Sequence, residues 1–131
     1  MNYLHINCGG KGVTVNHIAY DDDILEVGPS TVTPFDDRSN WVLSNTGHFL
    51  DGTGNYIAPP GNTNDQDLNL TARLSPISLT YYAYCLENRT YSVNLHFAEI
   101  QFAEDKLFTD EETLVLPSFG RRIFDVYIQV F

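Results

Sequence analysis

Several short segments of this chain alternate apolar and polar residues with a period of two, and this pattern limits the fold more than any other feature. The clearest segment is 122–130, where the apolar residues on one side are Phe124, Val126, Ile128 and Val130. A period of two is typical of a β-strand that packs one face on a core and turns the other toward water. The segment is therefore predicted to be a strand.

The same pattern, together with β-branched and aromatic residues, predicts further strands. They cover residues 91–102, 76–86, 67–74, 3–8 and 12–16. Within 67–74, the even-numbered apolar residues are expected to face the core and Arg73 to face outward. His96 falls within 91–102 and is therefore expected to be a core or edge histidine.

Turn residues separate these segments, and no long stretch has the 3.6-residue period of a helix. Many short strands with Gly and Pro turns predict an all-β fold, an antiparallel β-sandwich or jelly roll, in a single domain over residues 1–131. Residues 105–116 end at a proline and are predicted to be a loop. Residues 21–64 are polar and rich in turn residues, so they are predicted to form functional or packed loops.

Charge and hydropathy exclude some classes of partner. The formal net charge is −10, and such an acidic chain repels nucleic acid phosphates and anionic lipids. No stretch reaches the roughly 18 apolar residues of a membrane span, so no direct membrane insertion is expected. We expect no nucleic acid partner.

Two cysteines and two glycosylation sequons bear on the compartment. Cys8 and Cys85 form either one disulfide or two free thiols, and their number and spacing do not decide between these. The sequons begin at Asn69 and Asn88, on an expected outward strand position and in an expected turn. Both positions would accept a glycan, which favours passage through the secretory pathway.

The polar residues give no positive sign of catalysis, of a metal or of a cofactor. Residues 21–23 with Glu26 lack the spacing of a calcium loop and are interpreted as a solvated acidic loop. The histidines His5, His17, His48 and His96 form no short metal-binding pair. Glu99 and Asp125 are an alternative as an acid and base pair of a glycoside hydrolase, but neighbouring arginines favour a structural role. We expect no enzyme and no cofactor.

Four stretches in order carry a resemblance to a known family. They are LHINCGG at 4–10, NWVLSNTGHFLD at 40–51, TARLSPISLTYYAYCLENRTYSVNLHFAEIQF at 71–102 and GRRIFDVYIQ at 120–129. Together they resemble the malectin domain of plant leucine-rich-repeat receptor-like serine/threonine kinases, over nearly the whole chain. The resemblance implies a β-sandwich, incomplete at its C-terminal end, with the kinase domain elsewhere in the full-length relatives.

The resemblance also implies a function and a place. It implies a non-catalytic, extracellular ligand-binding module at the cell surface, whose partner is an oligosaccharide or cell-wall glycan. The alternative is a peptide or co-receptor. Within the pattern F-A-E-x-x-F, Phe102 is kept, while Gln101 and Leu74 stand where the sugar-binding relative has tyrosines. The expected ligand-binding residues are Phe102, Gln101, Leu74, Tyr81, Tyr82 and Tyr84.

Overall fold

The computed structural model describes residues 1–33, 39–50, 56–58, 68, 70–97, 100 and 123–129. The chain forms two compact units, Met1–Gln101 and Phe102–Phe131. All strands of the described residues lie in the first unit, and these residues contain no α-helix. The described part also lacks any helix with the length and apolarity needed to cross a bilayer. The all-β fold class is therefore confirmed, and its strand pairs are consistent with a β-sandwich.

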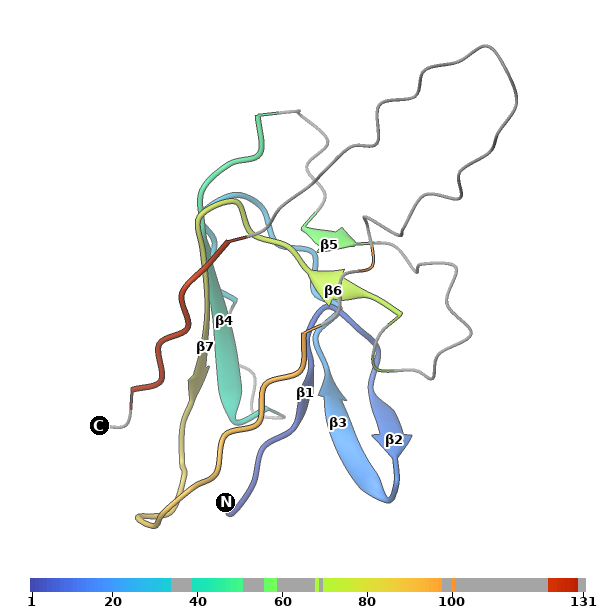
Figure 1. The fold of residues 1–131 in the computed structure, drawn as a ribbon, viewed down its shortest axis with the longest axis vertical. Coiled ribbons are helices and arrows are strands. Elements are labelled where there is room, and N and C mark those ends of the chain that lie inside the picture. Colours follow the sequence, from blue (N-terminus) through green and yellow to red (C-terminus); the bar gives the residue numbers. More distant parts are fainter. Residues whose placement is uncertain are drawn as a thin grey trace. The chain divides into compact units, whose positions relative to one another are not determined.

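The first sheet has the strand order β1–β3–β2 (Figure 1). Its strands are β1 (Ile6–Asn7), β2 (Val13–Val15) and β3 (Ile18–Asp22). β2 and β3 form an antiparallel hairpin, whereas β1 runs parallel to β3. The hairpin closes through Asn16 and His17, whose φ values are 50° and 66°. Two consecutive left-handed residues give a turn whose twist matches that of the flanking strands.

The second sheet pairs β4 (Trp41–Thr46) with β7 (Ser78–Ala83) in antiparallel register. The other edge of β4 is also hydrogen bonded. The Thr33 N–H donates to the Leu43 carbonyl at 2.8 Å, and the Asn45 N–H donates to the Thr31 carbonyl at 3.0 Å. Residues 31–33 thus add a short third row to this sheet.

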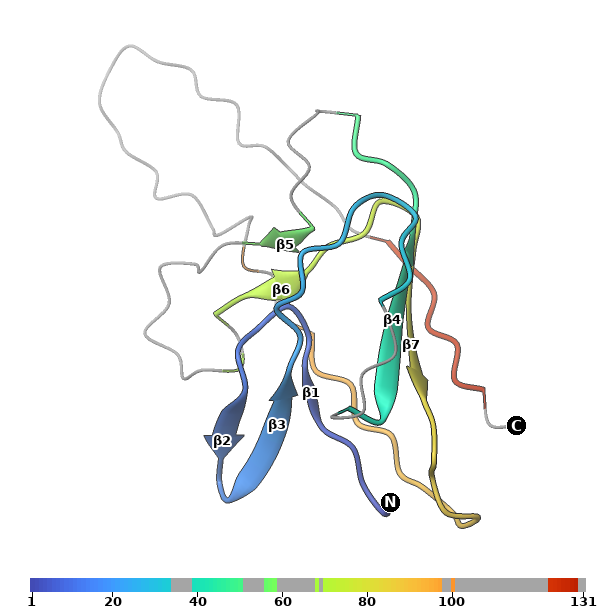
Figure 2. The same cartoon turned by 180° about the vertical axis from the view of Figure 1, so that it is seen from behind.

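A two-residue ladder joins the two sheets. It consists of β5 (Ile57–Ala58) and β6 (Ala72–Arg73) and is visible from both sides of the molecule (Figures 1 and 2). The Arg73 N–H donates to the Cys8 carbonyl at 3.1 Å, just after β1. The backbone of β6 is therefore fixed both to β5 and to the first sheet.

The core lies on the inner face of β4. The buried residues that form it are Val27, Trp41, Leu43 and Tyr56. Leu4, Ile6, Phe49 and Tyr81 pack against them. Along β4 the odd-numbered residues are buried, while Val42 and Ser44 between them are half-buried. One face of the sheet therefore supplies the core and the other faces outward.

The structure confirms part of the strand prediction. The predicted segments 76–86, 67–74, 3–8 and 12–16 contain β7, β6, β1 and β2 respectively. The prediction of loops throughout 21–64 is wrong, because β4, β5 and the 31–33 row lie within it. The polar residue Asn45 obscures the apolar pattern of β4, but its side chain bonds the backbone of Gly28 and Thr31, which allows it to be buried.

The strands predicted at 91–102 and 122–130 are not found in the described parts of those segments. Residues 91–97 and 123–129 have no strand structure. His96 is exposed instead of lying in a core or at a strand edge. An alternating sequence supplies a face to bury, but a strand also needs a neighbour to accept its backbone hydrogen bonds. The pattern alone did not reveal whether such a neighbour is present.

Candidate functional site

A buried ion pair stands at the centre of the first unit. Arg73 Nη2 lies 2.6 Å from Asp23 Oδ1, and both side chains are fully buried. Arg73 Nε also donates to Asp23 Oδ2 at 3.0 Å, so the contact is bidentate. Two predictions are thereby wrong: Asp23 is no part of a solvated loop, and Arg73 does not face outward. Each charge is buried because the other neutralises it.

The loop after β1 closes over this pair at Gly9. The Gly9 N–H donates to Asp23 Oδ2 at 3.0 Å. Its φ is +78°, and a Cβ at this position would lie 2.4 Å from the Arg73 backbone nitrogen. Only glycine combines this left-handed conformation with so close an approach. Gly9 therefore lets the loop after β1 close over the buried ion pair.

Tyr81, an expected ligand-binding residue, belongs to the same network. Its hydroxyl donates to Asp23 Oδ2 at 2.6 Å, and its ring lies 5.6 Å from that of Trp41. Burial, followed by the neighbouring Cys8 thiol and Asp23 carboxylate, raises the pKa of Tyr81 far above its usual value of 10.0. The hydroxyl therefore stays protonated and holds the core together.

The two cysteines are free thiols, and both residues are exposed. The structure thus has the free-thiol alternative and not the disulfide. Cys85 O accepts a hydrogen bond from the Met1 amino group at 3.2 Å. Although Cys8 is exposed as a residue, protein atoms around its sulfur desolvate it and raise the pKa of the Cys8 thiol.

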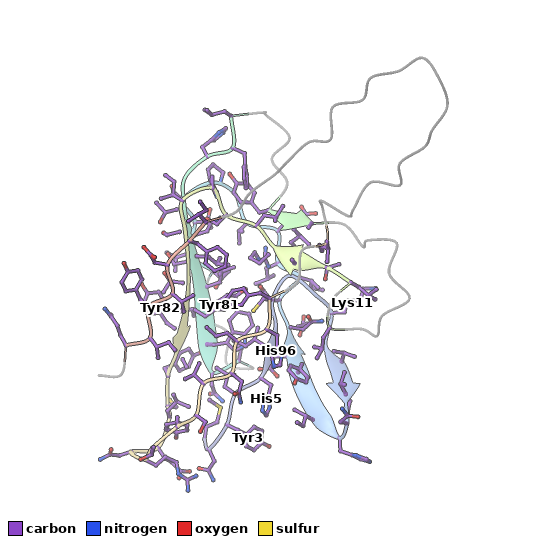
Figure 3. The ribbon with its side chains drawn as sticks, in the orientation of Figure 1. Tyr3, His5, Lys11, Tyr81, Tyr82 and His96 are labelled. Carbon is purple, nitrogen blue, oxygen red and sulfur yellow. The ribbon has the colours of Figure 1, made fainter. Side chains whose placement is uncertain are left out.

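The other expected ligand-binding residues lie apart from this network. Tyr82 is 51% exposed and points away from the core, on the opposite side of β7 from Tyr81 (Figure 3). Tyr84 is half-buried, and its hydroxyl donates to the Ser39 carbonyl. Leu74 is also half-buried, and its N–H donates to the Tyr56 carbonyl. Gln101 and Phe102 lie outside the described residues.

Other predicted residues fall outside these contacts. Asn88 is exposed in a bend, as a glycosylation site requires, whereas Asn69 lies outside the described residues. Asp125 is exposed in the second unit, and Glu99 is not among the described residues. Within the described ranges no three acidic, cysteine or histidine side chains are grouped as metal ligands.

The first sheet carries an aromatic row that the sequence analysis missed. The rings of Tyr3 and His5 are stacked, with their centroids 5.5 Å apart, and His5 lies 5.4 Å from Tyr20. The three residues come from two segments that meet only because β1 pairs with β3. The two-residue spacing of Tyr3 and His5 could have indicated that their rings lie on one face of a strand. No sequence pattern indicated that Tyr20 on β3 would lie beside them.

An open cleft of about 330 Å³ lies beside the same sheet. Its lining residues are Asn7, Lys11, Gly12, Val13, Leu70 and Thr71. The Asn7 side-chain amide donates to the Lys11 carbonyl at 2.8 Å, which fixes the loop before β2. An ammonium and a hydroxyl group at the edge of a partly apolar cleft suit a neutral polar ligand.

Comparison with known proteins gives the family. The family model for the malectin domain matches residues 2–130. A probable leucine-rich repeat receptor-like serine/threonine-protein kinase of Arabidopsis thaliana is 41% identical over 137 residues, which cover 96% of this chain and 12% of that protein. A probable LRR receptor-like serine/threonine-protein kinase of the same organism is 40% identical over 135 residues, with 98% and 13% covered. Another kinase of that description is 42% identical over 139 residues, with 96% and 13% covered.

The chain spans 12–13% of the length of these relatives. The part that it matches is a malectin domain and not the kinase domain to which their names refer. No solved structure matches the chain. Since the family model matches almost every residue and the relatives are 40–42% identical along nearly the whole chain, this chain belongs to the malectin domain family.

Proposed function

We propose that this chain is a non-catalytic ligand-binding module of the extracellular part of a receptor-like kinase, and that its ligand is an oligosaccharide or cell-wall glycan. The relatives are receptor-like kinases, and their malectin domain is separate from the domain that carries catalysis. The exposed Asn88 sequon supports passage through the secretory pathway and an extracellular location. The proposed module would bind a ligand and leave phosphorylation to a separate kinase domain.

The outward face of β4 and β7 is the observation that carries the proposal. Tyr82 is half exposed there and pairs with Val42, while Thr80 on the same face pairs with Ser44. An open aromatic ring beside hydroxyl groups is chemistry that suits a pyranose, which has an apolar C–H face and polar edges. The tyrosine on the inner face is engaged by Asp23, so Tyr82 is the tyrosine of β7 that a ligand would meet.

The direct experiment is binding of the folded, secreted chain to an array of plant cell-wall glycans. Tyr82→Ala is expected to weaken binding about tenfold, because a lost aromatic contact is worth on the order of 1 kcal/mol. Tyr82→Phe should recover most of that loss, since the ring is kept. Tyr127→Ala, at an exposed tyrosine of the second unit, is the matched control and should leave binding unchanged. Absence of binding to every glycan would contradict the proposed ligand class.

A peptide or co-receptor is the second candidate. Val32 and Ile77, near the same sheet, are 62% and 75% exposed, and such aliphatic groups are typical of protein interfaces. The two functions differ in how they respond to competition. If soluble glycan releases a partner that the chain has captured, the carbohydrate ligand is supported. If the partner stays bound in excess glycan, and a double Val32→Ser, Ile77→Ser variant no longer binds it, the protein partner is supported.

A further inference from the structure

We propose that the outward face of the β1–β3–β2 sheet is an oligosaccharide-binding site, in which Tyr3 stacks on one sugar ring and the cleft beside Lys11 receives another. The site is separate from the β4–β7 face. This inference depends on the proposed function for one point, that the ligand is a carbohydrate. We call this site the Tyr3 face and define it by Tyr3, His5, Tyr20, Asn7 and Lys11.

Strand register places Asn7 and Tyr20 on one side of the sheet, and His5 and Tyr3 continue the alternation of β1 toward the N-terminus. Asn7 pairs with Asp22, and Val13 pairs with Tyr20. Directly paired residues, and residues two apart on one strand, share a face. The opposite face is turned toward the core, because Ile6 packs against the core cluster. The aromatic row therefore lies on the same side of the sheet as Asn7, which lines the cleft and is itself buried.

Tyr3 is the open end of the aromatic row. Its side chain is 70% exposed, whereas His5 and Tyr20 behind it are half-buried. A backbone hydrogen bond fixes the position of His5 in this row, because the Asp21 N–H donates to the His5 carbonyl at 2.8 Å. A ring held in a stack and open on its outer side presents a fixed platform, so a ligand that stacks on it need not order the side chain first.

The cleft supplies polar groups at the other end of the Tyr3 face. Lys11 is exposed and offers an ammonium donor, and Thr71 offers a hydroxyl that can donate or accept. Figure 3 shows Tyr3 and His5 near the chain start and Lys11 beyond the far end of β1. From Tyr3 to Asn7 an extended chain covers roughly 13 Å, which is longer than one sugar ring. The surface therefore fits an oligosaccharide better than a monosaccharide.

The negative charge of the protein favours a neutral ligand over an anionic one at the Tyr3 face. The exposed Asp22 carboxylate lies on the same side of the sheet as Tyr20, since Asp22 pairs with Asn7. Asp21 lies on the other side, where it accepts a hydrogen bond from the Trp41 indole at 3.2 Å. The chain as a whole carries a net charge of −10. An anionic ligand such as a phosphorylated or nucleic acid chain would be repelled from this surface. A neutral polyhydroxyl chain has apolar ring faces for Tyr3 and hydroxyl groups for Lys11, Thr71 and the Asp22 carboxylate. These groups favour a neutral glycan.

The test uses two hexasaccharide probes, a β-1,4-linked and a β-1,3-linked glucan, titrated into the full chain by calorimetry. Tyr3→Ala is expected to weaken binding of the preferred probe about tenfold, with Tyr3→Phe recovering most of the loss. Gly12→Leu should also weaken binding, because Gly12 lines the cleft and a larger side chain there is expected to narrow it. A Cβ at Gly12 meets only ordinary contacts, the nearest at 3.5 Å, so the backbone should not be strained.

The variant set separates this inference from the proposed function. Tyr127→Ala is the control expected to bind normally, and thermal unfolding checks that each variant is folded. Loss of binding in Tyr82→Ala with full binding in Tyr3→Ala and Gly12→Leu would overturn the Tyr3 face and leave the proposed function intact. Failure of the unaltered chain to bind either hexasaccharide would overturn the Tyr3 face, and a positive glycan array would then still support the proposed function.

Discussion

At the scale of single residues, the Asp23 carboxylate joins parts of the chain that are far apart in sequence. It accepts hydrogen bonds from the Gly9 backbone, the Arg73 guanidinium and the Tyr81 hydroxyl. A local pattern could not reveal this, because Asp23 lies in a run of three aspartates and Arg73 lies 50 residues away in sequence. Burial of a charge depends on the partner that it meets in the fold, and sequence spacing does not supply that partner.

Removal of the buried arginine tests the importance of this pair. Arg73→Ala is expected to lower the free energy of unfolding by about 3–5 kcal/mol, because Asp23 would remain as an uncompensated buried charge. Urea unfolding followed by tryptophan fluorescence measures the change, since Trp41 lies in the core. The matched control is Arg89→Ala, which removes an exposed arginine 4.0 Å from Glu87 and should cost less than about 1 kcal/mol. Equal losses in the two variants would contradict a structural role for the pair.

Alkaline pH should weaken the fold through Tyr81. Burial and the nearby thiol and carboxylate raise the pKa of Tyr81 above 10.0 in the folded chain. The unfolded chain releases this proton near pH 10 while the folded chain retains it, so this contribution is fully present below pH 10 and declines above it. Tyr81→Phe should cost about 1.5–3 kcal/mol at neutral pH, as expected for a hydrogen bond to a charged group.

The difference between the unaltered chain and Tyr81→Phe is the quantity to follow. It should shrink as pH rises from 9 to 11 in urea unfolding curves, and the other tyrosines cancel in the difference. Tyr82→Phe is the control, because its ring is half exposed on the outer face. A difference that stays constant or grows with pH would contradict the sign of the Tyr81 effect.

At the scale of elements, sequence patterns predicted where some strands lie, but they did not predict which strands pair with each other. Residues 76–86 are rich in β-formers, and β7 lies within them. β4 was missed because its inner face includes Asn45, which is buried only because the turn before it supplies hydrogen-bond partners. Residues 91–97 and 123–129 show the opposite error, since their apolar periodicity is strong but they form no strand in the structure.

The β2–β3 hairpin gives a prediction about a single turn. His17 adopts φ 66° directly after Asn16 at φ 50°. A side chain in this left-handed region carries a steric cost that glycine avoids, and Asn-Gly is the preferred sequence for such a turn. His17→Gly is therefore expected to stabilise the chain by about 0.5–1 kcal/mol. A lower melting temperature in calorimetry would contradict the assignment of this turn, whereas Thr14→Gly within β2 should destabilise.

At the scale of the whole molecule, the family and the all-β class could be predicted from ordered motifs that extend along the chain. Those motifs include Gly9, which bonds the buried ion pair, and Arg73, which is one member of it. Such residues stabilise the fold, so the motifs indicate the fold and do not identify a ligand. The sites were less predictable. Tyr81 is an expected ligand-binding residue, and the sequence did not reveal its hydrogen bond to Asp23. The Tyr3 face arises from pairing between segments that no local pattern connects.

The most direct test of a carbohydrate-binding malectin domain is an NMR titration of the isotope-labelled chain with the glucan hexasaccharides. The predicted result is a set of shifted backbone amides confined to the outward faces, around Tyr3, Tyr20 and Lys11 or around Tyr82, with Trp41 and Leu43 in the core unchanged. Shifts restricted to residues 123–129, or a spectrum unchanged at saturating hexasaccharide, would contradict the account.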